Sequence, residues 1–255
     1  MTRRGRTVIV TGASRGIGEA VVRRFNRDGF RVVGIARSAE VLERLRVELG
    51  RDFVPMVADL GNLEEAQRTI ASLLEREGSN IGGLVLNAGV SANQLFHESS
   101  RESREQEMNL NYHSPAIFLQ RTLESFSERT EKGRVVVVSS LTALIPFPGN
   151  AGYSASKAAF FHLLRSVRLE QKGGNVEISA VLPGLTRTEM SAHFETLLPR
   201  TSPETVANAI VACWSKPEFP KLVGPLNRLI HTLNRLEPSV FDQAVVALQR
   251  WVPHA

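Results

Sequence analysis

Apolar residues recur along most of the chain in two alternating patterns. Short apolar runs predict buried strands at residues 7–10, 31–36, 53–58, 83–86, 133–138 and 176–181. Between them, an apolar residue at every third or fourth position predicts helices at residues 19–25, 39–49, 63–77, 103–129 and 153–172. This alternation predicts an α/β fold with a doubly wound parallel sheet, which binds its ligand at the carboxyl ends of the strands.

The segment after residue 200 has a different pattern. Ser202 and Pro203 predict the start of a helix that reaches about residue 214, and residues 221–224 predict a short last strand. One face of the next helix is apolar, with Leu226, Leu229, Ile230, Leu233 and Leu236 opposite Asn227, Arg228, His231, Asn234 and Arg235. A second apolar stripe follows, formed by Phe241, Ala244, Val245, Leu248 and Trp251.

These two amphipathic helices have more than one interpretation. We favour their packing on the domain, the substrate cleft or a second subunit. The alternative is a patch that faces lipid, because a basic face opposite leucines also suits a membrane interface.

Length and composition limit the class of protein. With 255 residues and 42% hydrophobic content, we expect one domain over residues 1–255, with residues 190–255 forming its substrate cleft and C-terminal helices. The single cysteine, Cys213, excludes an internal disulfide, and the histidines lack metal-ligand spacing, so no metal is expected. No apolar run approaches the ~18 residues of a membrane span, and we expect a cytoplasmic protein.

The net charge of +5 raises the question of a nucleic-acid partner. The basic residues are scattered, however, and no nucleic-acid-binding motif is present. An anionic cofactor or substrate therefore explains the charge better, and we expect no nucleic-acid partner.

A glycine-rich turn lies between the first strand and the first helix. It reads Thr11-Gly12-Ala13-Ser14-Arg15-Gly16-Ile17-Gly18. Strand, glycine turn and helix are the order that places backbone N–H groups against a pyrophosphate. Gly12 permits the tight turn, Gly16 lets the backbone approach phosphates, and Gly18 lets helix and strand pack closely.

The residues after the second and third strands bear on the nucleotide. Ala36 and Arg37 stand where an acidic side chain would bind the ribose hydroxyls of NAD, and Arg15 lies in the glycine turn. Two guanidinium groups near one phosphate favour NADP(H) over NAD(H). Asp59 has two interpretations at this point: it accepts from an adenine amino group, or it caps the helix at residues 63–77.

Pro115 interrupts the long helix predicted at residues 103–129. Because proline has no N–H, the carbonyl of Asn111, four residues earlier, is left without its helical donor. An ordered water is the expected partner of that carbonyl if it is buried.

Tyr153 and Lys157 share one helical face, because they are four residues apart. A free tyrosine has a pKa near 10, and lowering it to about 7 takes ~4 kcal/mol. One ammonium at about 4 Å, at an effective dielectric near 20, supplies roughly that energy, to which an oxidised nicotinamide would add. Ser140 ends the fifth strand thirteen residues earlier, so the set suits general acid–base chemistry.

Taken together, these motifs resemble those of the short-chain dehydrogenase/reductase family, in its compact one-domain form with a Rossmann fold. Beyond the glycine turn the matching residues are Asp59, Asn87-Ala88-Gly89, Asn111, Ser140, Tyr153, Lys157, Pro183-Gly184, Thr186 and Thr188. They occur in the family's order over residues 6–190.

The resemblance implies a role for each of these residues. Tyr153 would exchange the proton, Ser140 would hold the substrate oxygen, and Lys157 would lower the tyrosine pKa and bind the nicotinamide ribose. Asn111 would hold a water that relays protons; Asn109 competes for this role, but we expect its carbonyl to bond normally to His113. The implied cofactor contacts are Gly12, Ser14, Arg15, Gly16, Ile17, Gly18, Arg37, Asp59 (adenine), Leu60, Asn87, Ala88, Gly89, Pro183, Gly184, Thr186 and Thr188 (carboxamide).

The implied function is that of an NADP(H)-dependent oxidoreductase of ketones or secondary alcohols. Within enzymes, a reductase of acyl-thioester ketones competes with one for small, steroid-like or lipid alcohols. A regulator that binds NADP(H) without catalysis is the alternative from another class. The family also implies a homodimer or homotetramer formed through the two long helices, of which we favour the dimer.

Overall fold

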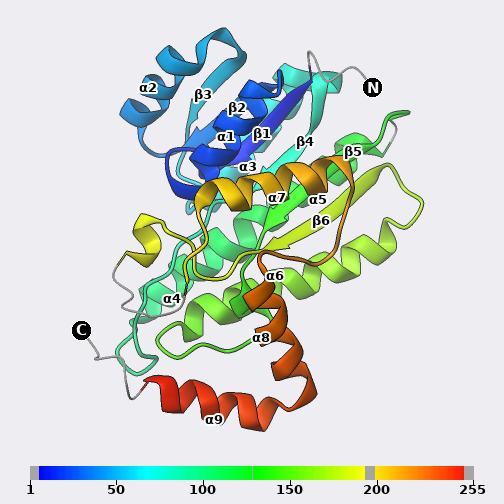
Figure 1. Cartoon of the computed structure of the whole chain (residues 1–255). Coiled ribbons are helices and arrows are strands. Elements are labelled where there is room, and N and C mark those ends of the chain that lie inside the picture. The colour runs from blue at the N-terminus through cyan, green and yellow to red at the C-terminus, as the bar shows by residue number, and fades with distance from the viewer. Residues whose placement is uncertain (1–5, 128, 193–198, 250–255) are drawn as a thin grey trace.

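A computed structural model describes residues 6–127, 129–192 and 199–249 of the chain (Figure 1). Its described part contains one parallel sheet with the strand order β3-β2-β1-β4-β5-β6-β7. The strands are β1 (Thr7–Thr11), β2 (Arg31–Ala36), β3 (Phe53–Val57), β4 (Ile81–Leu86), β5 (Gly133–Val138), β6 (Val176–Leu182) and β7 (Lys221–Leu222). The predicted parallel sheet is confirmed.

Helices cover both faces of this sheet (Figure 1). They are α1 (Gly16–Arg27), α2 (Ala39–Leu49), α3 (Leu63–Glu77), α4 (Arg101–Met108), α5 (Ser114–Phe126), α6 (Ala151–Glu170), α7 (Pro203–Ser215), α8 (Pro225–Leu236) and α9 (Pro238–Gln249). One core packs the sheet against α1, α2 and α7, and the other packs it against α3, α5 and α6. The sheet is therefore doubly wound, as predicted.

Strand β1 lies between β2 and β4, so the chain reverses its direction of winding beside β1. Helices α1 and α2, on the β2 side of β1, cover one face of the sheet, and α5 and α6, on the β4 side, cover the other. Such a reversal opens a crevice outside the carboxyl ends of the central strands. The glycine turn after β1 and the Asn87-Ala88-Gly89 segment after β4 both begin at this crevice.

Local sequence signals fix several element ends where they were predicted. The hydroxyl of Ser38 accepts from the Val41 N–H at the start of α2, and Gly50 ends that helix with φ +77°. Ser202 accepts from the Thr205 N–H at the start of α7. By contrast, Asp59 does not cap α3; Asn62 does, by accepting from Glu64 and Glu65 N–H. That interpretation of Asp59 was wrong, because the loop after β3 extends three residues further before the helix begins.

The long helix predicted at residues 103–129 is interrupted by a π-helical turn, η3 (Asn109–His113), which separates α4 from α5. The Asn109 carbonyl accepts from the Ser114 N–H rather than from His113, so the prediction of a normal bond there was wrong. Pro115 lies in the first turn of α5, where its missing N–H is tolerated. The change of helical register thus occurs just before the proline, and it contains Asn111.

Helix α8 is rotated relative to the expected orientation. Leu229, Leu233 and Leu236 are 55%, 50% and 74% exposed, so they do not pack on the domain itself. Packing of this face on a substrate or a second subunit stays a prediction. Asn227 faces inward instead: its amide donates to the Val223 carbonyl and lies over Gly184, where a Cβ would come within 2.3 Å of Asn227 Oδ1. This contact fixes the rotation of the helix. Trp251, from the second predicted stripe, lies outside the described residues.

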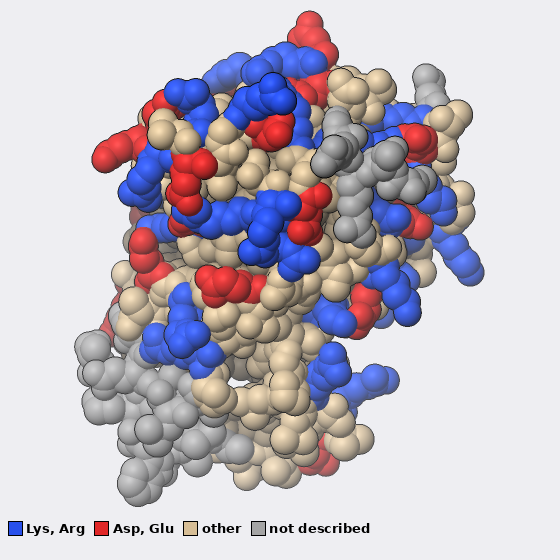
Figure 2. All heavy atoms as spheres, turned by 45° about the horizontal axis from the view of Figure 1, so that its top comes forward, with Lys and Arg blue, Asp and Glu red and all other residues tan. Residues whose placement is uncertain are grey.

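The surface is mixed in charge. Figure 2 shows lysine and arginine interspersed with aspartate and glutamate over one face, in agreement with the scattered basic residues of the sequence. Within the described ranges, no helix combines the length and the apolar character that a membrane span requires.

An aromatic cluster packs α1 against α7, and we expect substitutions in it to lower the stability of the fold. The Phe25 ring is fully buried and lies 5.2 Å from Phe30 and 5.0 Å from Trp214 between centroids. Phe25→Ala is expected to lower the free energy of unfolding by about 3–5 kcal/mol, because it removes a large buried ring and leaves a cavity. Val47→Ala on α2, where Val47 is 74% exposed, should change it by less than ~0.5 kcal/mol. Denaturant unfolding of both variants measures the difference, and equal effects would contradict this account of the core.

Candidate active site

The glycine turn after β1 has the backbone that an anion site requires. Gly12 and Gly16 adopt φ +68° and +56°, which other residues rarely adopt. A Cβ on Gly18 would lie 1.9 Å from the Gly12 carbonyl oxygen, so helix α1 can approach β1 only with glycine there. Arg15 precedes α1 without a side-chain cap bond, which leaves the N-terminal N–H groups of that helix available to an anion.

Asn87 holds this turn in place. Its side-chain amide donates to the Thr11 carbonyl at 3.0 Å and to the Gly12 carbonyl at 3.2 Å. In return, the Thr11 hydroxyl oxygen accepts from the backbone N–H groups of Asn87 and Ala88 at 2.9 and 3.0 Å. The ends of β1 and β4 therefore form one rigid unit beneath the crevice.

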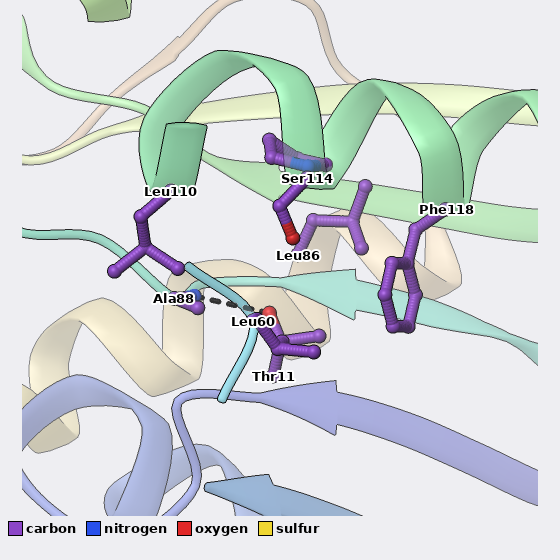
Figure 3. A pocket seen from close by; sticks show the side chains of 8 residues that line it. Thr11, Leu60, Leu86, Ala88, Leu110, Ser114 and Phe118 are labelled. Atoms are coloured by element: carbon purple, nitrogen blue, oxygen red, sulfur yellow. Dashed lines mark hydrogen bonds between the residues drawn. The ribbon is translucent and has the colours of Figure 1, made fainter. Parts of the chain in front are cut away.

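A small cavity lies beside this unit, between the sheet edge and helix α5. Figure 3 shows the bond from Ala88 to Thr11 at its floor, and the side chains of Leu60, Leu86, Leu110, Ser114 and Phe118 around it. Leu60, one of the predicted cofactor contacts, is buried in its wall. The wall is largely apolar.

The residues predicted to select the nucleotide lie at the surface of the crevice. Arg37 is exposed directly after β2. Arg15 forms an ion pair with Glu189, which follows the end of β6, so its guanidinium is already paired across the crevice. Asp59 is exposed, and one of its carboxylate oxygens accepts from the Gly61 N–H at 2.9 Å.

The segment after β6 returns to the glycine turn. The Pro183 carbonyl accepts from the Leu141 N–H at 2.8 Å, which joins the loops after β5 and β6. Thr186 is buried, and its hydroxyl donates to the Gly184 carbonyl. A Cβ on Gly16 would meet the Thr188 side chain at 3.0 Å. Thr188 therefore lies against the glycine turn, as a contact to the same ligand requires.

Asn111 is buried, and the π-helical turn directs its side chain at the loop after β4. Its oxygen accepts from the Val90 N–H at 2.9 Å, and its amide donates to the Val90 carbonyl at 2.8 Å. The same amide donates to the Ser156 hydroxyl at 2.9 Å, and this hydroxyl donates to the Tyr153 carbonyl at 2.7 Å. Asn111 therefore connects three elements through side-chain hydrogen bonds.

Lys157 is a buried cation without an acidic partner among the described residues. Only 6% of its surface is exposed, and its Nζ lies 3.1 Å from the position that a Cβ on Gly89 would take. The same Nζ lies 5.7 Å from the centroid of the Tyr153 ring. Burial lowers the pKa of Lys157 from 10.5 to about 8.

Tyr153 lies beside Ser140 in the same interior region. Burial raises the pKa of Tyr153 to about 12; a hydrogen bond with Ser140 lowers it in part, and the charge of Glu107 raises it further. This direction is opposite to the sequence-based expectation. Desolvation of the phenolate was left out of that expectation, and it outweighs an ammonium placed over the ring.

The Ser140 hydroxyl has a defined orientation. Its oxygen accepts from the Thr142 N–H at 3.2 Å and from the Thr142 hydroxyl at 2.9 Å. Because the N–H and the hydroxyl of Thr142 both donate to this oxygen, the Ser140 proton points elsewhere. Ser140 donates it in the hydrogen bond with Tyr153.

Sequence reasoning missed four residues of this region: Thr142, Ser156, Gly152 and Glu107. Ser156 lies one helical turn after Tyr153, and Glu107 lies one turn before Asn111, so helical spacing alone could have placed both near the site. Thr142 and Gly152 are in the turn after β5 and the first turn of α6, whose paths the sequence does not determine.

Comparison with known proteins decides the family. The model for short chain dehydrogenases matches residues 6–197. The chain belongs to the short-chain dehydrogenase family. It is therefore an oxidoreductase of that family, and the predicted membership is confirmed.

Relatives in this family align with most of the chain. An oxidoreductase of Salmonella typhimurium, UcpA, is 31% identical over 226 residues, which are 87% of this chain and 84% of the relative. A human mitochondrial dehydrogenase/reductase SDR family member 2 is 32% identical and covers 74% of this chain and 68% of its own. A short chain dehydrogenase of Burkholderia cenocepacia, solved in complex with NADP, superposes with a TM-score of 0.83 at 25% identity and covers 96% of this chain and 99% of its own.

The burial of Lys157 predicts a stability that depends on pH. The lowered pKa corresponds to about 3 kcal/mol of destabilisation wherever the lysine is charged in both states, below about pH 8. Between pH 8 and about 10.5 the unfolded chain binds more protons at this residue, so this penalty is relieved as pH rises. Lys157→Met is therefore expected to be more stable than wild type at pH 7 by about 1–3 kcal/mol, and this gap should close towards pH 10.5.

Urea unfolding of both proteins across this pH range measures the gap, and the titration of Tyr153 cancels because both proteins contain it. A wild type more stable than Lys157→Met at pH 7 would show that the ammonium has a partner that offsets its burial.

Proposed function

We propose that this protein is an NADP(H)-dependent oxidoreductase that interconverts ketones and secondary alcohols, with Tyr153 as general acid and base. The observation that supports this best is the meeting of Ser140, Tyr153, Lys157 and Asn111 at the carboxyl edge of the sheet. Lys157 of this group lies against Gly89, two residues after Asn87, whose amide binds the glycine turn. A cofactor-binding regulator would have no use for a half-buried phenol and a buried ammonium at that place.

The residues of the crevice fit a dinucleotide. The positive φ angles of Gly12 and Gly16 and the uncapped start of α1 form a cradle for a pyrophosphate. Thr188 lies next to that cradle, where it would hold the nicotinamide carboxamide. Arg37, exposed after Ala36 with no acidic residue at the end of β2, would bind a 2′-phosphate. A relative at 25% identity was solved in complex with NADP.

The nicotinamide would supply or accept the hydride, and the chain's own residues would manage the proton. The Ser140 hydroxyl, fixed by Thr142, would donate to the substrate oxygen in place of the phenol. Tyr153 would then give its proton to that oxygen as the alcohol forms. The Lys157 ammonium would stabilise the phenolate that remains, because it is held beside the ring in a poorly solvated interior.

The raised pKa of Tyr153 favours one starting state. With a pKa near 12 the phenol is fully protonated at neutral pH, which is the form that donates to a carbonyl. Oxidation of an alcohol needs the phenolate, and it would therefore need added positive charge beside the ring.

A panel of carbonyl compounds would identify the substrate class. A 3-oxoacyl-[acyl-carrier-protein] reductase of Rickettsia prowazekii is 28% identical over 187 residues, which makes acyl-thioester ketones one candidate. Exposed apolar side chains near the crevice, Phe96, Phe147 and Met190, make aryl and lipid ketones the other. NADPH oxidation with acyl thioesters, aryl ketones, steroid ketones and aldehydes separates these classes, and no turnover with any of them would favour the regulator.

Tyr153→Phe tests the proton donor. We expect kcat to fall by about 10²–10⁴-fold because the variant has no proton to transfer. NADP⁺ binding, measured by calorimetric titration, should stay within ~3-fold of wild type. The chain's other tyrosine provides the control: Tyr112 contacts His113 and Phe160, and Tyr112→Phe should keep kcat within ~2-fold. Wild-type turnover by Tyr153→Phe would refute the assignment.

Arg37→Leu tests the choice of cofactor. A charge-assisted contact to the 2′-phosphate is worth about 1.5–3 kcal/mol, so kcat/KM for NADPH should fall by ~10–100-fold, with little change for NADH. Arg44→Leu, an exposed arginine on α2, is the matched control and should leave both values unchanged. If wild type uses NADH as efficiently as NADPH, or if the ratio is the same in Arg37→Leu, the NADP(H) assignment fails.

A further inference from the structure

Glu107 is a buried carboxylate to which the proposed reaction gives no role. It lies in the last turn of α4 with 4% of its surface exposed, and it is the buried residue of an otherwise surface helix. Burial raises its pKa. A carboxylate in such a place is costly unless its oxygens are matched by donors, and a leucine or valine would fill the same space without that cost.

Only one of the two carboxylate oxygens has a donor. Oε1 accepts from the Ala92 N–H at 2.8 Å. Across the described residues, no hydrogen bond to Oε2 and no ion pair to Glu107 is formed. Arg104, one turn earlier, is engaged elsewhere: it donates to the carbonyl and hydroxyl of Ser99 and stacks over Phe96 at 5.3 Å.

The free oxygen points towards the catalytic tyrosine's helix. A Cβ on Gly152 would lie 2.1 Å from Glu107 Oε2, so the absence of a side chain at position 152 makes room for the carboxylate. Gly152 immediately precedes Tyr153 in the first turn of α6. The charge of Glu107 also acts on the phenol, since it contributes to the raised pKa of Tyr153.

The same carboxylate lines a small hollow beside the start of α6. The hollow is bordered by the loop after Asn87-Ala88-Gly89, with Ala92, Asn93 and Phe96, and by residues 149–152, which lead directly into Tyr153. Its polar wall includes Asn150, whose side-chain oxygen lies 2.7 Å from the Ser91 hydroxyl. Asn93 adopts φ +52°, a left-handed conformation that asparagine enters more readily than most residues.

We propose that Glu107 is a specificity-determining residue, and that its free oxygen binds a hydroxyl or ammonium group carried by the substrate close to the reacting carbonyl. This proposal rests on the proposed function. A site built to accept a hydrogen bond from the substrate discriminates strongly against an analogue that lacks the donor, because the bound analogue covers the acceptor and leaves it unpaired. A substrate carboxylate at the same position would be repelled.

Three ketones of nearly equal size test this specificity. In α-hydroxyacetophenone the carbon next to the ketone carries a hydroxyl, and in propiophenone a methyl takes the place of that hydroxyl. In benzoylformate the carbon next to the ketone is itself a carboxylate. Wild type is expected to prefer α-hydroxyacetophenone to propiophenone by about 10-fold or more in kcat/KM, and to use benzoylformate least.

Two substitutions at Glu107 then remove its carboxylate, one of them keeping a single amide oxygen. Glu107→Met should abolish the preference for the hydroxyketone, a change of ~10-fold or more in the ratio of kcat/KM values. Glu107→Gln keeps an oxygen for the Ala92 N–H, should give an intermediate ratio, and should raise the relative use of benzoylformate. Glu105→Gln, an exposed neighbour paired with Arg101, is the matched control and should keep the wild-type ratio.

Each ratio is taken within one protein, so partial loss of folded protein cancels. A wild type without preference for the hydroxyketone, or an unchanged ratio in both Glu107 variants, overturns this inference while propiophenone turnover upholds the proposed function. Absence of turnover with all three ketones, together with the wider panel, refutes the proposed function and this inference with it.

Discussion

The site depends on one buried ammonium that has no acidic partner among the described residues. Lys157 is held between Gly89 and the Tyr153 ring, where burial lowers its pKa to about 8. A cation so placed is unfavourable for folding, since nothing nearby neutralises it. It becomes favourable only when negative charge develops next to it, on the tyrosine oxygen or on a bound ligand. In the proposed reaction, Lys157 would therefore stabilise the phenolate of Tyr153.

The surrounding structure keeps this cation in place. The π-helical turn at Asn109–His113 directs Asn111 at the loop after β4 and at Ser156, and Ser156 in turn binds the carbonyl of Tyr153. Asn87 fixes the glycine turn to the same loop. Gly89 has no side chain, so Lys157 can approach the backbone there. The proposed cofactor cradle and the proposed catalytic group thus share one framework, in which a shift of either would move the other.

The sequence predicted the elements whose signals are local. The parallel sheet, the glycine turn, the Ser38 and Ser202 caps and the end of α2 at Gly50 follow from short patterns, because neighbouring residues decide them. Errors arose where distant residues decide. The rotation of α8 depends on Asn227 meeting Gly184, and the pKa of Tyr153 on how far the fold removes it from water. The cap of α3 is different, because Asn62 is a local signal directly before the predicted helix start. Helical spacing could have placed Glu107 near Asn111, but its contact with Gly152 exists only in the folded chain.

The ionisation of Tyr153 measures the central claim most directly, and the chain favours the measurement because it has only two tyrosines. A near-ultraviolet titration of tyrosinate in wild type, with Tyr153→Phe as the blank for Tyr112, isolates this one group. The account predicts a pKa of about 12 for Tyr153 in the free protein, and a much lower value once NADP⁺ adds positive charge beside the ring. A Tyr153 that titrates near 10, both alone and with NADP⁺ present, would contradict it.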